Sequence, residues 1–348
     1  MQALILAGGE GTRLRPLTMT VPKPVVPLAN RPFITYMFDW LDHHGFDDIV
    51  MSCGFLAEGV REVLGTGSLN GVTIQYVDEP EPLGTAGAVK LAEPVLGERF
   101  AVLNGDVLTD LDISKLRTFH EQHGASATLG LYPVEDPSSY GVVVTAEDGR
   151  VEEFLEKPAP GTAPTNHVNA GMYMLEHDVL EHIDGGRKVS FEREVFPSLV
   201  GAGLHALPLE GYWMDIGTPQ RYLQATRDIL RGTVVTQVSP SSAVDGATPP
   251  VLVGAGCQIA PDAKVGPDVT LGDEVRVEAG ASVAASSLHD GVVVGEGAVV
   301  QDSIVGPNAR IAPGARLEDE TVIGEGTAVP PGAHLVGGRL PADGWPGE

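Results

Sequence analysis

Hydrophobic and polar positions along the first two thirds of the chain predict strands and helices in turn. Short apolar runs of buried-strand length lie at residues 3–7, 49–53, 73–77 and 101–103. Between the first two runs, residues 32–46 repeat apolar residues at helical spacing, from Phe33 to Leu41. Alternation of strands with helices predicts an α/β domain, in which helices cover both faces of a mostly parallel sheet.

The pattern changes twice before residue 250. Residues 127–175 contain strand-like runs with no helix between them, which predicts an inserted and partly antiparallel segment. Thr218 and Pro219 then form a helix start, an N-cap followed by proline in the first turn, ahead of residues 220–231. Residues 233–250 have no periodicity and end in Pro-Pro, so we expect a linker with at most one short strand.

From Val253 onward, aliphatic residues recur every six positions. They are Val253, Ile259, Val265, Leu271, Val277 and Val283, and, after a disturbed stretch at 284–292, Val293, Val299, Val305, Ile311, Leu317, Ile323, Val329 and Leu335. A period of six fits neither an amphipathic helix nor an alternating strand, and it is typical of a parallel β-helix. The predicted organisation is therefore a first domain at 1–232, a linker at 233–250, a β-helix at 251–338 and a tail at 339–348.

Composition narrows the classes of function. The net charge of −25 argues against a nucleic-acid or anionic-membrane binder, and an enzyme of phosphorylated substrates would need local cations and a divalent metal ion. No apolar run is long enough to span a bilayer, and the N-terminus reads as a first strand instead of a signal peptide. Cys53 and Cys257 suggest no disulfide framework, so we expect a cytoplasmic protein.

A glycine-rich segment follows the first strand directly. Gly8, Gly9 and Gly11 leave backbone N–H groups exposed for phosphate oxygens, and Arg13 adds positive charge. The segment matches neither the Walker loop nor the dinucleotide fingerprint, so kinases and Rossmann dehydrogenases fit poorly. Lys23 lies between two prolines, a stiff context that suits a positioned charge, although a surface lysine is also compatible with it.

Two aspartates are candidate metal ligands. Asp106 follows a buried strand, where open α/β sheets bind ligands, although a lone aspartate there more often caps a turn. Asp215 lies in Trp-Met-Asp-Ile-Gly-Thr-Pro. If the two carboxylates converge, they would hold one Mg²⁺ whose remaining ligands are water and phosphate oxygens.

Two further segments could contact a ligand, and each could equally be a plain turn. Glu156 and Lys157 precede Pro158, which predicts an irregular strand end where both side chains could reach a ligand. Asn169 and Gly171 place a side-chain amide beside bare backbone, which suits sugar hydroxyls.

These segments together resemble the nucleotide-sugar pyrophosphorylase family, particularly its mannose-1-phosphate guanylyltransferases. The matching pieces are LAGGEGTRLRPLT, PKP, EPLGTAGA, NGD, FLEKP, NAGMY and WMDIGTP, in this order over residues 6–219. The resemblance implies a Rossmann-like nucleotidyltransferase domain followed by a left-handed β-helix. It also implies that an NTP and a sugar 1-phosphate react, with Mg²⁺, to give a nucleotide-sugar and pyrophosphate.

The resemblance assigns roles residue by residue. Arg13, Lys23, Asp106, Lys157 and Asp215 would be catalytic, with Asp106 and Asp215 as the Mg²⁺ ligands. The nucleotide would contact Leu6, Ala7, Gly8, Gly9, Gly11, Thr12, Arg13, Lys23, Gly84, Thr85, Gly87 and Asp106. The sugar phosphate would contact Asn104, Gly105, Gly141, Glu156, Lys157, Asn169 and Gly171.

The resemblance favours GTP and mannose 1-phosphate, because Pro-Leu-Gly-Thr-Ala-Gly is similar to the guanylyltransferases. ATP, UTP or dTTP with glucose or heptose 1-phosphate remains an alternative. Two alternatives belong to other classes of function. One is an acyltransferase activity of the β-helix, which would need a histidine as general base, and residues 251–338 contain only His289 and His334. The other is a non-catalytic regulatory homologue. We expect free nucleotide as the only nucleic-acid ligand, no membrane partner, and homo-oligomers formed through the β-helix.

Overall fold

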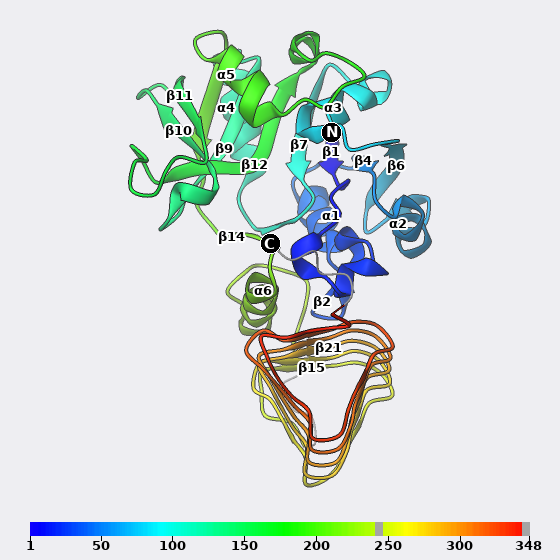
Figure 1. Ribbon diagram of the computed structural model, residues 1–348. Coiled ribbons are helices and arrows are strands. Elements are labelled where there is room, and N and C mark those ends of the chain that lie inside the picture. The colour runs from blue at the N-terminus through cyan, green and yellow to red at the C-terminus, as the bar shows by residue number, and fades with distance from the viewer. Residues whose placement is uncertain (241–245, 343–348) are drawn as a thin grey trace. The chain divides into compact units, whose positions relative to one another are not determined.

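The computed structural model describes residues 1–240 and 246–342, and the chain forms two compact units (Figure 1). The first unit comprises Met1–Gly9 and Met37–Trp213, and the second comprises Glu10–Tyr36 and Met214–Glu348. Each unit thus combines segments that are distant in sequence. The domain boundaries expected from the sequence, at residues 232 and 251, stay a prediction.

A mixed sheet forms the first unit. Among the described residues its strand order is β11-β10-β12-β7-β1-β4-β6-β5, with β9 paired to β12 and β13 paired to β9. The bounds are β1 Gln2–Leu6, β4 Asp48–Cys53, β5 Gly67–Leu69, β6 Val72–Asp78, β7 Arg99–Asn104, β9 Ala127–Pro133, β10 Gly141–Thr145, β11 Val151–Glu156, β12 His167–Glu176 and β13 Leu204–Pro208; the short β8 is Val107–Thr109. The centre β7-β1-β4-β6 is parallel, as the strand–helix alternation predicts. The inserted segment β9 to β12 pairs antiparallel, also as predicted.

Helices complete the first unit. They are α1 Ile34–His43, which begins in the second unit, α2 Ala57–Leu64, α3 Gly84–Ala92, α4 Ile113–His123 and α5 Phe196–Leu199. Helix α3 packs against β1 and β4, and α4 packs against β9, β12 and β13. Leu4, Phe100, Val102 and Tyr173 are fully buried in the core between these layers, which explains why the strands read as continuous apolar runs.

Short elements of the second unit precede its β-helix. They are η1 Thr12–Leu14, η2 Leu17–Met19, η3 Lys23–Val25, the hairpin β2 Pro27–Leu28 with β3 Arg31–Pro32, β14 Trp213–Asp215 and α6 Pro219–Arg231. The Thr218 hydroxyl accepts a hydrogen bond from the Arg221 N–H at 3.3 Å, which confirms the predicted N-cap. In the predicted linker, Ala247 makes one parallel bridge with Val265, and residues 241–245 lie outside the described residues.

Three parallel sheets form the β-helix, whose coils Figure 1 shows end-on as stacked triangles. The first sheet contains β15 Val251–Val253, β18 Val269–Leu271, β21 Ser287–Leu288, β24 Ile304–Val305, β27 Val322–Ile323 and β30 Arg339–Leu340. The second contains β16 Gln258–Ile259, β19 Arg276–Val277, β22 Val293–Val294, β25 Arg310–Ile311 and β28 Ala328–Val329. The third contains β17 Lys264–Val265, β20 Ser282–Ala284, β23 Val299–Gln301, β26 Arg316–Glu318 and β29 His334–Val336. This is the arrangement of the left-handed β-helix that the resemblance implies.

The interior of the β-helix corrects one part of the predicted repeat. Leu271 pairs with Leu288, one residue earlier than a strict period of six predicts. Val294 and Val300 are therefore the fully buried residues, and the predicted Val293 and Val299 are only half-buried. A second shortened corner, before Val305, restores the predicted positions from there to the end.

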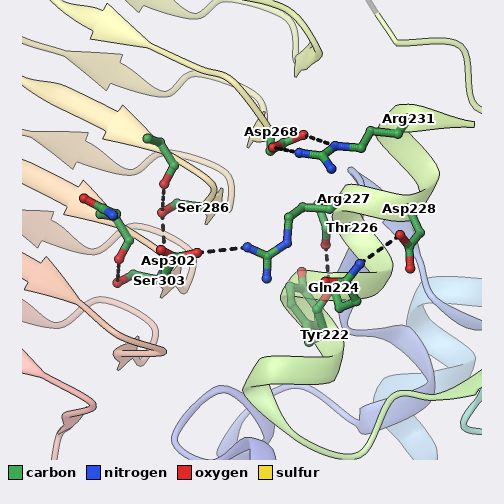
Figure 2. Close-up of polar contacts among 12 residues, drawn as sticks. Tyr222, Gln224, Thr226, Arg227, Asp228, Arg231, Asp268, Ser286, Asp302 and Ser303 are labelled. Atoms are coloured by element: carbon green, nitrogen blue, oxygen red, sulfur yellow. Dashed lines mark hydrogen bonds and ion pairs between the residues drawn. The ribbon is translucent and has the colours of Figure 1, made fainter. Parts of the chain in front are cut away.

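Helix α6 is fastened to the β-helix by two ion pairs (Figure 2). Arg227 Nη1 lies 2.9 Å from Asp302 Oδ1. Arg231 binds Asp268 through two bonds of 2.9 and 2.6 Å. Asp268 is only 6% exposed, but the Arg231 side chain is 56% exposed, so only the carboxylate end of this bidentate pair is shielded from water.

Candidate active site

The predicted site residues belong to both compact units. The first unit contains Leu6, Ala7, Gly8, Gly9, Gly84, Thr85, Gly87, Asn104, Gly105, Asp106, Gly141, Glu156, Lys157, Asn169 and Gly171. The second contains Gly11, Thr12, Arg13, Lys23 and Asp215.

Close backbone approaches explain the glycines at the carboxyl end of β1. Leu6 pairs with Asn104 of β7, and the Gly105 N–H donates to the Leu6 carbonyl at 2.9 Å. A Cβ on Gly105 would lie 2.7 Å from that carbonyl oxygen, and a Cβ on Gly8 would lie 2.6 Å from Glu79 Oε1. Position 105 is therefore too crowded for a side chain, because its neighbour is backbone, whereas a side chain at position 8 would displace the Glu79 carboxylate.

Glu79 lies against a predicted site residue, Gly8, and was not named from the sequence. Its Oε1 accepts from the Ser52 hydroxyl at 2.9 Å, and its Oε2 accepts from the Leu83 N–H at 3.3 Å. The carboxylate thus lies beneath Gly8 and ties the ends of β4 and β6 together. Its position directly after β6, at the edge where parallel sheets bind ligands, was the signal that could have identified it.

Packing also accounts for the glycines at the start of α3. Gly84 has φ +72°, and a Cβ there would lie 2.6 Å from the Val189 carbonyl oxygen. A Cβ on Gly87 would lie 2.9 Å from the Arg187 carbonyl oxygen. Because the Ala86 and Gly87 N–H groups both donate to Val189 O, that carbonyl already caps the helix. The bordering of the base by Gly84 and Gly87 stays a prediction.

Thr85 is held by a second residue that the sequence analysis missed. Its hydroxyl donates to Glu192 Oε2 at 2.9 Å and accepts from the Phe191 N–H at 2.9 Å. The other oxygen of Glu192 accepts from the Tyr173 hydroxyl at 3.5 Å. No motif or strand end marks Glu192, so only the folded chain shows that it joins α3 to β12.

The structure brings three of the predicted sugar contacts together. Asn169 Oδ1 accepts from the Gly171 N–H at 2.9 Å, and Asn169 Nδ2 donates to the Tyr173 hydroxyl at 2.9 Å. Gly171 has φ +69°, and a Cβ there would lie 2.5 Å from Asn104 Nδ2. Asn104, Asn169 and Gly171 therefore form one polar cluster between β7 and β12.

Strand β11 ends at Glu156, in agreement with the irregular end that Pro158 predicts. Lys157 follows with φ +51°, and its Nζ lies 4.0 Å from Glu156 Oε1. The Lys157 side chain is 59% exposed, whereas that of Glu156 is 21% exposed. Burial, followed by the negative charge of Glu192, raises the pKa of Glu156.

In the second unit, the glycine-rich segment closes on itself. Gly11 has φ +63°, and its carbonyl accepts from the Leu14 N–H at 2.9 Å and from the Thr18 hydroxyl at 2.8 Å. A Cβ on Gly11 would lie 3.1 Å from Lys23 Cβ. Gly11 and Lys23, both predicted to bind phosphate, are thus packed against each other.

Arg13 and Asp215 meet at Gly217. A Cβ on Gly217 would lie 2.5 Å from Arg13 Nη2 and 3.1 Å from Asp215 Oδ2. Asp215 also forms an ion pair with Arg221 of α6. Glycine at 217 therefore leaves room for a guanidinium beside a half-buried carboxylate.

The chemistry of the predicted metal ligands fits Mg²⁺. Carboxylate oxygens are the ligands that this cation prefers, with phosphate and water completing its shell. Asp106 lies in the first unit and Asp215 in the second, so their convergence stays a prediction. Residues 1–240 and 246–342 contain no group of three or more acidic, histidine or cysteine side chains arranged for a metal ion.

The model of the family described as "Nucleotidyl transferase" matches residues 2–232, and the "GMPPB C-terminal domain" model matches residues 247–340. The chain belongs to the nucleotidyl transferase family. Members of this family typically use a divalent metal ion.

Relatives in this family support the resemblance seen in the sequence. A mannose-1-phosphate guanylyltransferase of Mycobacterium tuberculosis is 38% identical over 76% of this chain and 72% of its own length. Mannose-1-phosphate guanylyltransferase 1 of Arabidopsis thaliana is 40% identical over 76% of both chains. The resemblance to mannose-1-phosphate guanylyltransferases is confirmed.

Solved structures agree with the fold of the nucleotidyl transferase domain. HddC from Yersinia pseudotuberculosis is 30% identical with a TM-score of 0.56, covering 64% of this chain and 97% of that one. A putative glucose-1-phosphate thymidylyltransferase from Bacillus anthracis is 26% identical with a TM-score of 0.57, covering 65% and 94%. In the part of the chain that the structure describes, no helix has the length and apolar character needed to cross a membrane.

Proposed function

We propose that this chain is a mannose-1-phosphate guanylyltransferase, which transfers a guanylyl group from GTP to mannose 1-phosphate and releases pyrophosphate. The observation that carries the proposal is the match to relatives of that name, 38–40% identical over about three quarters of this chain and of theirs. The polar cluster of Asn104, Asn169 and Gly171 supports a sugar-binding role for the first unit.

The reaction needs no covalent intermediate. A phosphate oxygen of the sugar phosphate is anionic near neutral pH and attacks the α-phosphorus in line with the leaving pyrophosphate. The protein's contribution is then positioning and charge stabilisation. In this proposal Arg13 and Lys23 bind the triphosphate, and glycine at 217 leaves room for the Arg13 guanidinium beside Asp215.

The first unit would orient the sugar phosphate. Lys157 is largely exposed and would bind its phosphate, while Glu156 and Asn169 would accept or donate to sugar hydroxyls. The Asn169 amide is already oriented by Gly171 and Tyr173, so little reorganisation is needed on binding.

Asp106 and Asp215 are the residues that would hold Mg²⁺. When bound, the cation would neutralise negative charge on the α- and β-phosphate oxygens. We also propose a cytoplasmic location, where GTP is available, and homo-oligomers assembled through the β-helix. The free thiols of Cys53 and Cys257 are compatible with a reducing compartment.

The test is release of pyrophosphate from purified protein with Mg²⁺. Mannose and glucose 1-phosphates are crossed with GTP, ATP, UTP and dTTP, and each NTP is also incubated alone. We expect fast release only with mannose 1-phosphate and GTP. Preference for glucose 1-phosphate with dTTP would favour the activity named for the Bacillus anthracis neighbour.

Asp106→Asn provides the second arm, with Asp136→Asn as an exposed carboxylate control whose partner is the Ser138 N–H. We expect Asp106→Asn to lower kcat by about 100-fold or more and the control to leave it unchanged. Absence of sugar-dependent release with every pair would refute the catalytic proposal and favour a regulatory homologue.

A further inference from the structure

The hairpin that follows Lys23 is fastened to the β-helix by its turn. Strands β2 and β3 are joined through Ala29 and Asn30, which have φ +45° and +59°. Asn30 Nδ2 donates to the carbonyl of Leu271 in β18 at 2.6 Å. The segment that begins with Lys23 therefore ends on the backbone of a β-helix coil.

A buried side-chain network makes a second connection between the same two parts. The Tyr222 hydroxyl of α6 donates to the carbonyl of Pro27 in β2. It also lies 3.2 Å from Ser287 Oγ and 3.1 Å from His289 Nε2. Thr270 Oγ1 lies 2.9 Å from Ser287 Oγ. These four side chains are at most 3% exposed, so their hydrogen bonds are shielded from water.

The Pro27 carbonyl, at which the network ends, fixes the direction of its hydrogen bonds. The Pro27 carbonyl can only accept, so the single phenolic proton of Tyr222 is donated to it. Ser287 and His289 must then donate to the Tyr222 oxygen, and His289 carries its proton on Nε2. All donors point toward Pro27, and hydrogen bonds aligned in this way polarise and strengthen one another.

His289 interrupts the β-helix repeat where this network needs a donor. In four of the other five coils, the residue that follows the inward aliphatic of the first sheet is glycine, at Gly254, Gly272, Gly306 and Gly324, and in the last coil it is Pro341. The imidazole is buried at 3% exposure, and its Nδ1 has no partner among the described residues. Because such burial is unfavourable, a packing role alone does not explain a histidine there.

Gly324, which takes the place of His289 two coils further along the β-helix, lies against the segment that follows Arg13. A Cβ on Gly324 would lie 3.2 Å from Pro16 Cβ, so the backbone of that coil lies directly against Pro16. The β-helix therefore supports the chain at Pro16, Pro27 and Asn30. Pro16 lies between Arg13 and Lys23 in the sequence, and Pro27 and Asn30 follow Lys23.

We propose that His289 and Tyr222 are positioning residues of the transfer reaction, which act through the Pro27 carbonyl to hold the segment that carries Lys23. The inference rests on the proposed function, in which Lys23 binds the triphosphate. Loss of the network then weakens GTP more than mannose 1-phosphate, because Glu156, Lys157 and Asn169 lie in the other unit.

The experiment compares four variants of the full chain with the wild type. Tyr222→Phe removes the donor to Pro27, His289→Ala removes the imidazole N–H, and His289→Gln restores an N–H at the matching position. Ser303→Ala is the control, since Ser303 is equally buried in the β-helix but its hydroxyl donates to Gln301 O within its own coil. The readouts are kcat, KM for GTP, KM for mannose 1-phosphate and the unfolding midpoint.

We expect Tyr222→Phe and His289→Ala to raise KM for GTP about tenfold and to change KM for mannose 1-phosphate less than about twofold. We expect His289→Gln to stay within about threefold of the wild type and Ser303→Ala to lose stability only. An unchanged KM for GTP in the first two variants would overturn the proposal. Equal impairment of His289→Gln and His289→Ala would also overturn it.

The wild type distinguishes this inference from the proposed function. If the wild type releases no pyrophosphate with any substrate pair, the proposed function fails. The inference is then decided by calorimetric binding of GTP to the same proteins. About tenfold weaker binding by Tyr222→Phe would support it, and equal binding would overturn it.

Discussion

Acid should weaken the folded state through His289. Burial lowers the pKa of this imidazole from 6.5 to about 4, and in the unfolded chain the pKa returns to its ordinary value. Between these values the unfolded chain binds a proton that the folded chain excludes. Stability is therefore intact above about pH 6.5 and is lost progressively as the pH falls toward 4.

The magnitude follows from the separation of the two pKa values. Each unit corresponds to about 1.4 kcal/mol, so His289 should remove about 2 kcal/mol from the free energy of unfolding between about pH 7.5 and about pH 5. The assay is urea unfolding at both pH values for the wild type and His289→Gln. Glutamine can still donate an N–H to Tyr222 but takes up no proton.

Other groups titrate alike in both proteins and cancel from the difference. They include His44 and His120, whose pKa values are also lowered by burial. The wild type should lose about 2 kcal/mol more than His289→Gln on acidification. Losses that agree within about 0.5 kcal/mol would show that His289 is not held neutral by burial.

Three further substitutions test individual contacts. Gly217→Ala should displace the Arg13 guanidinium and lower kcat/KM for GTP about 10- to 100-fold with an unchanged unfolding midpoint, and unaltered kinetics would contradict this placement. Gly84→Ala should destabilise the first unit by about 1–3 kcal/mol in urea unfolding, because φ is +72° and the new Cβ meets Val189 O. Gly185→Ala in the same unit is the control and should change stability little, because a Cβ there has no atom within 4 Å. Asp268→Asn should lower the free energy of unfolding by about 1–3 kcal/mol, because it breaks the bidentate pair to α6. Added salt should then have little effect on the stability of the variant. A loss below about 0.5 kcal/mol would show that the pair contributes nothing to stability.

The β-helix was predictable because its signal is local and repeated. Each six-residue unit faces the same interior, so the spacing of aliphatic residues reports the fold directly. The two shortened corners were not predictable in detail, because the residues before Leu288 and Val305 contain no feature that fixes which valine turns inward. Pairing with the adjacent coil decides that Val294 and Val300 are buried.

The candidate site likewise contains residues that the sequence predicts and residues that only the folded structure reveals. Arg13 and Asp106 could be named from the sequence because a glycine-rich segment or a charge after a strand end is a local pattern, and Lys23 because it lies between two prolines. Glu79 and Glu192 could not, since each carboxylate lies beside the predicted site residues only because distant segments fold against it.

The sequence by itself determined the two kinds of architecture, the order of the family motifs and the residue types available for phosphate chemistry. Only the tertiary structure decided which of those residues touch. The hydrogen bonds of Tyr222 to Pro27 and His289 join positions far apart in the chain. Their energies depend on distance and burial in space, and neither quantity is encoded in any short stretch of sequence.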